Sequence, residues 1–180
     1  MRAGGGRGSA AVRRGGRRVC NDGAVHDDDR AGGGAQTGDG TQVGAGVPAE
    51  LADFLLEAVD GRPVRIAACV CGGCGGRVFL VLVNGSGAER ACAGCGSRAF
   101  VADSGEYWDE ESWEDDEPGP AGCPSCGSEE FEAAVAFSLG GDGSVRWVTV
   151  GLRCVEDGFC GVYADWKIDY LPTDHLLTLV

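Results

Sequence analysis

Eight of the ten cysteines of this chain fall into four closely spaced pairs, and no other feature constrains the fold as strongly. The pairs, in chain order, are Cys71 and Cys74, Cys92 and Cys95, Cys123 and Cys126, and Cys154 and Cys160. A tetrahedral zinc ion takes four thiolates at about 2.3 Å, and a two-residue spacer lets one tight turn supply two of them. Two such turns at the ends of a β-hairpin can complete one site, so the pairs predict two structural zinc ions.

Disulfide bonds are the competing use of these cysteines. The chain has 33 glycines but only six Phe, four Trp and three Tyr, so its apolar core is small and needs a metal or disulfides to hold it. The first thirty residues lack the apolar run of a secretory leader, and no segment is long and apolar enough to span a bilayer. We therefore expect a cytoplasmic chain, where reducing conditions favour metal ligation.

The charge of the chain is divided very unevenly. Residues 1–46 carry seven Arg and five Asp, a net charge of +2, whereas residues 47–180 carry eight Lys or Arg and 23 Asp or Glu, a net charge of −15. A body this acidic is repelled by the phosphate backbone of nucleic acids. Arg77, Arg90 and Arg98 could lie on one side of the first unit, but they are too few to outweigh it. The charge thus favours a protein partner over nucleic acid.

Composition divides the chain into four regions. Residues 1–46 are Gly- and Arg-rich with almost nothing to bury, which predicts a disordered tail that contains Cys20. Residues 47–102 contain a helix and the first cysteine unit, and residues 103–120 form an acidic segment with Tyr107, Trp108 and Trp113. Nine acids and no base in residues 103–117 indicate a solvated linker, although such a segment could also dock on a basic surface. Residues 121–180 form the second unit.

Periodicity predicts the secondary structure within these regions. Residues 48–59 form an amphipathic helix, which we expect to pack on the first unit. In the second unit, residues 131–139 alternate as a strand with one solvated face, residues 145–152 are apolar on both faces as in a central strand, and residues 162–170 form a third strand. The predicted fold is mostly β, built from small antiparallel hairpins stapled by zinc, with one short helix.

The first unit resembles the zinc-ribbon family, in which two cysteine turns at the ends of a β-hairpin hold one ion. The resemblance covers about residues 69–100 and implies that Cys71, Cys74, Cys92 and Cys95 bind one zinc ion. The second unit resembles the same family over about residues 121–170, which implies a second ion on Cys123, Cys126, Cys154 and Cys160. It departs from the family because five residues, not two, separate Cys154 from Cys160.

Other uses of the cysteines stay open at this stage. The turns could pair in sequence, first with second and third with fourth, or in a nested way, second with third. Nested pairing costs little more loop entropy. Sequential pairing is favoured because the strands of each hairpin then fit between its own two turns. Cys69 can be a core thiol or a spare ligand. Thiol redox chemistry could release zinc on oxidation, but the turns lack the helix N-terminus that activates a redox cysteine.

Catalytic zinc fits the sequence poorly. A catalytic ion keeps one position open for water and has a general base nearby. The chain has only two histidines, His26 in the tail and His175 near the C-terminus. We therefore expect a non-catalytic protein that acts as an acidic protein-binding or scaffold module, with a transcription-related nucleic-acid ribbon or a redox switch as alternatives.

Overall fold

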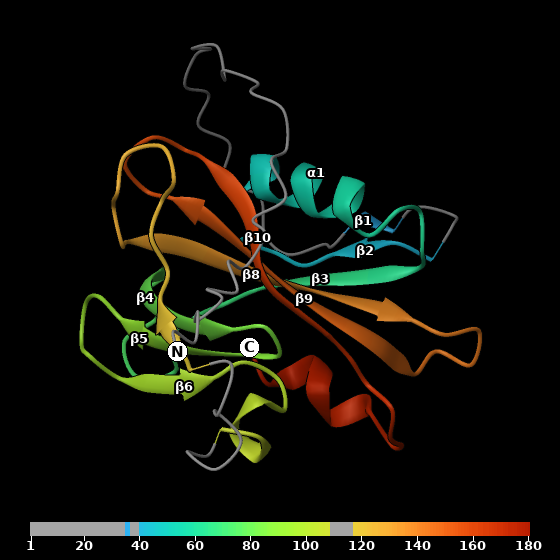
Figure 1. The fold of residues 1–180 in the computed structure, drawn as a ribbon. Helices are drawn as coiled ribbons and strands as arrows, with labels where there is room; N and C mark the ends of the chain where they lie inside the picture. The colour runs from blue at the N-terminus through green and yellow to red at the C-terminus, as the bar shows by residue number, and fades with distance from the viewer. Residues whose placement is uncertain (1–34, 37–39, 109–116) are drawn as a thin grey trace, which may run out of the picture.

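The computed structural model describes residues 35–36, 40–108 and 117–180, and its fold is mostly β with one α-helix, as predicted (Figure 1). The strands are β1 (Ala35–Gln36), β2 (Gln42–Val43), β3 (Val64–Ala68), β4 (Val78–Asn84), β5 (Gly87–Cys92), β6 (Arg98–Phe100), β7 (Gly119–Pro120), β8 (Phe131–Leu139), β9 (Val145–Cys154) and β10 (Cys160–Lys167). The helices are α1 (Ala49–Ala58) and the 3-10 helices η1 (Ser104–Glu106) and η3 (Asp174–Thr178).

All described strands belong to one curled sheet with β8 at its centre. One edge of β8 pairs with β9, which in turn pairs with β10. The other edge is shared: β3 pairs with residues 134–138 of β8, and β4 pairs with residues 131–132. Strands on both sides of the segment predicted as a linker therefore lie side by side.

The strands of β8 and β9 have apolar side chains on both faces because both faces are covered. On one face, Phe131, Val135 and Phe137 of β8 pack in the main core with residues of β4 and β5. On the other face, Leu51 and Leu55 of α1 form a second core with residues of β3 and β8. Figure 1 shows α1 on one side of the β8–β10 strands and the β4–β6 hairpin on the other.

The packing of α1 corrects two sequence predictions. The helix lies against β8, β9 and β10 as well as β3, so it does not pack on the first unit alone. The face of β8 predicted to be solvated is buried, because Ala134 and Ala136 lie beneath α1 and are fully buried. Gly151 of β9 also belongs to this contact, since a Cβ atom there would lie 2.8 Å from Leu55 Cδ2. Small residues on this face mark the seat of the helix.

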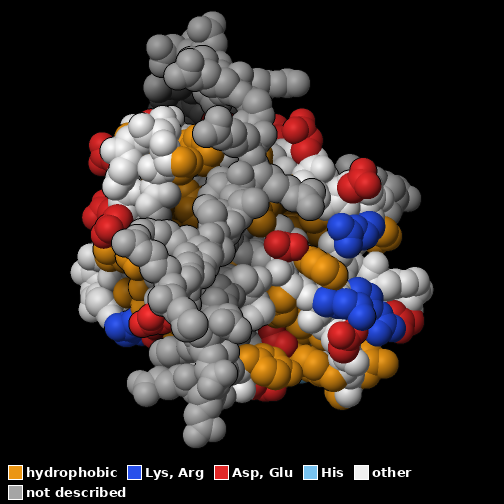
Figure 2. Space-filling view, in the orientation of Figure 1, with side chains coloured by type: hydrophobic (Ala, Val, Ile, Leu, Met, Phe, Trp, Pro, Cys, Tyr) orange, Lys and Arg blue, Asp and Glu red, His pale blue; other side chains and the backbone are white. Residues whose placement is uncertain are grey.

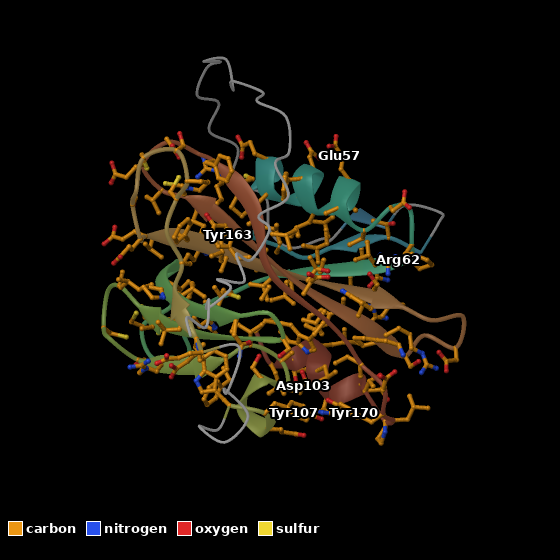
Figure 3. The ribbon with its side chains drawn as sticks, viewed as in Figure 1. Glu57, Arg62, Asp103, Tyr107, Tyr163 and Tyr170 are labelled. Carbon is orange, nitrogen blue, oxygen red and sulfur yellow. The ribbon has the colours of Figure 1, made fainter. Side chains whose placement is uncertain are left out.

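Two further predictions are wrong at their boundaries. The tail predicted over residues 1–46 includes β2, which pairs parallel with β3 and antiparallel with β1; residues 1–34 and 37–39, with Cys20 and His26, lie outside the described residues. The predicted linker begins with buried chain. Asp103 is 4 % exposed and accepts hydrogen bonds from Trp166 Nε1 (2.9 Å) and the Tyr170 hydroxyl (2.8 Å), as Figure 3 shows for Asp103 and Tyr170. Residues 109–116 lie outside the described residues.

The described chain contains two structural repeats. The first repeat (β3 to β6) and the second repeat (β7 to β10) have the same order of elements: a strand, a cysteine turn, a β-hairpin, another cysteine turn and a closing strand. They meet where β4 pairs antiparallel with β8, with Phe79 opposite Phe131. Phe79 is the fifth residue after Cys74, and Phe131 is the fifth after Cys126. Because equivalent residues face each other across an antiparallel pair, a local twofold axis relates the repeats.

The strand register follows this axis on both sides. Each repeat sends its first strand across to the other, since β3 pairs with β8 and β7 pairs with β4. Ala68 lies opposite Ala134 in the first of these pairs, and Pro120 lies opposite Leu82 in the second. The step of 52 residues from Ala68 to Pro120 is the same as the step from Leu82 to Ala134. Each repeat thus contributes a strand that pairs with the other repeat, and the cysteine turns of both repeats belong to one continuous sheet.

Candidate metal centres

Four turns of the same geometry carry the candidate ligands, two in each repeat. They span residues 71–75, 92–96, 123–127 and 154–158. In each turn the amide of the fifth residue donates to the carbonyl of the first, at 2.8, 2.8, 2.8 and 3.0 Å in chain order. The fifth residue is always glycine with a positive φ, between 72° and 80°. This left-handed conformation favours glycine because other residues there are strained.

The first centre brings together the four predicted ligands of the first repeat. Cys71 Sγ lies 3.5 Å from Cys95 Sγ, and Cys74 Sγ lies 3.5 Å from Cys92 Sγ. All four sulfur atoms lie within 4.8 Å of one another. Ligands at about 2.3 Å from a tetrahedral ion are about 3.8 Å apart, whereas bonded sulfurs are about 2.05 Å apart. The cluster therefore has the dimensions of a metal site, and its thiols form no disulfide.

The second centre contains three of its four predicted ligands, and its fourth is Asp157. Cys126 Sγ lies 3.6 Å from Cys154 Sγ, and Cys123 Sγ lies 3.6 Å from each Asp157 carboxylate oxygen. These four side chains also lie within 4.8 Å of one another. Asp157 stands in its turn where the other three turns have their second cysteine. The pairing of turns is sequential in both centres, as expected.

Cys160 is not part of this cluster, which corrects the prediction. It is the first residue of β10 and lies opposite Arg153, just as Arg98 begins β6 opposite Ala91. Its side chain packs on the α1 side of the sheet, whereas Cys154 packs in the main core on the other side. The Cys160 thiol donates to the carbonyl of Gly158 at 3.5 Å. The face of the strand on which Cys160 lies thus turns its thiol away from the centre.

A sequence signal for Asp157 does exist. The fourth turn reads Cys-x-x-Asp-Gly, and its glycine, Gly158, matches Gly75, Gly96 and Gly127 at the same place in the other turns. A pattern of paired cysteines does not detect this turn, because the next cysteine is three residues further along. Carboxylate oxygen is an accepted zinc ligand at about 2.0–2.2 Å.

Local hydrogen bonds prepare Asp157 as an anion. Its Oδ1 accepts from the amide of Phe159 at 3.0 Å. This bond, followed by one from Ser125, lowers the pKa of the Asp157 carboxyl to about 2. The Asp157 carboxylate is therefore ionised and oriented at neutral pH.

Tyr163 (Figure 3) lies beside the same centre: its ring meets that of Phe131 edge-on at 5.4 Å, and its hydroxyl donates to the Gly122 carbonyl at 3.2 Å.

The pKa of the thiol is lowered at some of the candidate cysteines and raised at others. The hydrogen bond between Cys95 Sγ and the Ser97 hydroxyl, 3.3 Å apart, lowers the pKa of the Cys95 thiol to about 6. Amides of the turn, Cys74 first, lower the pKa of Cys71. Burial raises the pKa of Cys154 to about 12. A bound cation would displace the remaining thiol protons, because metal ligation requires thiolates.

The remaining candidates lie outside both clusters. Cys69 is 1 % exposed in the main core, and burial raises the pKa of its thiol to about 11. His175 stacks against Tyr170 with ring centroids 6.4 Å apart. Arg77 donates to the Gly46 carbonyl at 2.6 Å, Arg90 is buried over the Phe79 ring, and Arg98 pairs with Glu89. In the described part of the chain, no histidine joins a group of metal-ligating side chains.

No family model, no curated protein and no solved structure matches this chain. No helix among the described residues is long and apolar enough to cross a membrane.

Proposed function

We propose that this chain is a non-catalytic structural-zinc protein that binds two ions and acts as an acidic scaffold for a protein partner. The observation that carries the proposal is the convergence of four equivalent turns into two clusters of tetrahedral size. Soft thiolates select zinc over the hard cations, and a closed tetrahedral set of four protein ligands is typical of structural rather than catalytic zinc.

Metal would contribute to stability by joining elements that are distant in sequence. In the first centre, the ligands come from the turn after β3 and the turn after β5, so an ion fixes both ends of the hairpin. Structural zinc contributes about 10–16 kcal/mol in small zinc-finger peptides. The core of this glycine-rich chain is modest, and an energy of that order can decide whether it folds.

The acidic charge supports a protein partner over nucleic acid. Residues 47–180 carry a net charge of −15. With a divalent ion bound, the first centre would change this total by a formal −2 through its four thiolates, and the second by −1, because the charge of Asp157 is already counted. On the face shown in Figure 2, acidic side chains are spread widely and basic ones gather at a few places. Phosphate contacts need clustered and unengaged Lys and Arg, whereas Arg90 is buried and Arg98 pairs with Glu89.

Metal analysis of reduced, chelator-washed protein tests the proposal. We expect close to two zinc ions per chain, and loss of the cooperative unfolding transition when the metal is stripped under reducing conditions. A metal content near zero with all thiols intact would overturn it. Binding of labelled duplex at low salt that falls steeply as salt rises would contradict the acidic scaffold and favour a nucleic-acid ribbon.

A further inference from the structure

The twofold relation between the repeats leaves one surface without its counterpart. On the second repeat, α1 covers the face formed by β8, β9 and β10. The equivalent face of the first repeat is formed by β4, β5 and β6. It contains a groove of about 310 Å³. The side chains that matter here are Leu80, Leu82, Ala91, Arg98, Pro120 and Glu129.

Equivalent positions show that this groove is the counterpart of the seat of α1. Pro120 of β7 borders it, as Ala68 of β3 borders the seat of α1. Leu82 is equivalent to Ala134, which lies beneath α1. Arg98, at the start of β6, is equivalent to Cys160, which also packs on the α1 side. The groove and the helix seat are therefore the same place in the two repeats.

The two surfaces differ in polarity in a way that favours an apolar ligand on the first repeat. On the second repeat, Glu132 pairs with Arg153 at 2.7 Å, and Arg153 Nε lies 3.7 Å from a carboxylate oxygen of Glu50 on α1. On the first repeat the positions equivalent to Glu132 and Arg153 are Leu80 and Ala91. Leu80 is 42 % exposed. The helix α1 is held partly by ion pairs, whereas the equivalent positions of the groove, Leu80 and Ala91, present apolar side chains beside the ion pair of Glu89 and Arg98.

The dimensions and charges of the groove define what fits it. On the second repeat, the small residues Ala134 and Gly151 let Leu55 of α1 approach the sheet closely. The equivalent positions in the groove are the larger residues Leu82 and Glu89. A helix bound in the groove would therefore lie nearer to Leu80. A volume of about 310 Å³ is at the lower end for ligand sites, which suits two or three apolar side chains. Glu129 lies at the rim and is exposed, and the body is strongly acidic.

We propose that this groove binds a short amphipathic helix of a partner protein, with an apolar stripe at i and i+4 spacing in the groove and Lys or Arg on its flanks. Helix-in-groove recognition uses such anchors. Opposite charges around the apolar anchors would steer the partner towards this acidic body. The proposal rests on the protein-binding part of the proposed function and does not depend on which metal the centres hold.

Two synthetic peptides with the same apolar stripe provide the probes. One has the sequence of residues 47–60, which contains α1, and the other carries the substitutions E50K, D53K, E57K and D60K. Fluorescence anisotropy at low salt is expected to show saturable binding of the Lys peptide. Binding of the acidic peptide is expected to be at least tenfold weaker. Failure of the Lys peptide to bind, or equal binding of both, would overturn the proposal.

A matched pair of protein variants locates the binding. The double variant L80E/A91R places in the first repeat the charge pair that Glu132 and Arg153 form in the second, so the fold already accommodates it. The control is L179E, because Leu179 is 43 % exposed, close to the 42 % of Leu80, but does not line the groove. We expect L80E/A91R to weaken Lys-peptide binding at least tenfold and L179E to leave it unchanged. Unchanged binding by L80E/A91R would overturn the proposal.

Two further measurements keep the alternatives apart. If sedimentation shows a dimer that L80E/A91R converts to a monomer, the groove binds a second copy of this chain and the partner helix is wrong. Zinc content is measured on the same samples. Peptide binding by protein without zinc would refute the metal centres but support the groove. Two zinc ions without peptide binding would support the metal centres but overturn the groove proposal.

Discussion

The first repeat gathers four thiols at its candidate metal site, whereas the second gathers three thiols and the carboxylate of Asp157. The backbone of the four turns is nevertheless the same, including the glycine with positive φ that ends each one. The comparison teaches that this turn conformation does not require a cysteine at its fourth place, so the turn is a better guide to a candidate ligand position than the cysteine pair.

The repeats differ also in length and covering. The β8–β9 hairpin has strands of nine and ten residues, against seven and six for β4 and β5. The second repeat also has two buried faces, one under α1 and one in the main core. The first repeat keeps one face exposed around Leu80. The two repeats thus share the strand pairing next to the twofold axis but differ in whether the outer face of their strands is covered.

The largest expected effect comes from removing an equivalent buried ligand in each repeat. Cys92 and Cys154 both begin the second turn of their repeat, and both are buried. We expect Cys92→Ser and Cys154→Ser each to lose one of the two zinc ions and to lower the free energy of unfolding by more than about 4 kcal/mol, because loss of a metal is among the few causes of so large a change. Metal analysis and urea unfolding measure both; an unchanged metal content for Cys154→Ser would break the equivalence of the centres.

The second prediction tests the exchanged ligand itself. Asp157→Ala should lose one ion and retain the other, and should lower the free energy of unfolding by about 3 kcal/mol. Asp157→Cys should keep both ions, since it gives the fourth turn the sequence of the other three. Absorption of the cobalt-substituted protein distinguishes a fourth thiolate from a carboxylate. Full metal content in Asp157→Ala would show that Asp157 is no ligand.

The cysteine pattern predicted much of this architecture because ligand spacing and strand alternation are local signals. The first cluster, three of the four side chains of the second, the helix and the three long strands of the second repeat follow from residues near one another in sequence. The exchange of β3 and β7 between repeats does not, because it depends on pairing over long distances. Ala134 and Ala136 show the same limit, since alanine is compatible with a solvated face and with a surface beneath a helix. Asp103 illustrates it again: its hydrogen-bond partners, Trp166 and Tyr170, lie more than sixty residues further along.

A third, smaller effect is expected where α1 meets the second repeat. Gly151→Ala places a Cβ atom 2.8 Å from Leu55 Cδ2, and overpacking a filled core costs about 1–3 kcal/mol. The control is Glu89→Ala at the equivalent position of the first repeat, which removes an ion pair whose Arg98 and Glu89 side chains are 57 % and 13 % exposed, adds no atom to the core, and should cost about 1 kcal/mol or less. Thermal unfolding compares the two, and equal costs would show that α1 does not press on the sheet at Gly151.

The smallest effect should come from Cys160→Ser, which separates the two assignments of the fourth ligand. In the structure the Cys160 thiol lies on the α1 side of β10 and contacts the Gly158 carbonyl, and a serine hydroxyl can make the same contact. We therefore expect both zinc ions to be retained and the free energy of unfolding to change by less than about 1 kcal/mol, as for substitutions away from the core and its sites. Metal content is the decisive measurement, because serine is a poor zinc ligand and would release the ion from a site that used Cys160. Loss of one ion in Cys160→Ser, with both ions retained in Asp157→Ala, would reverse the assignment and remove the equivalence of the fourth turn with the other three.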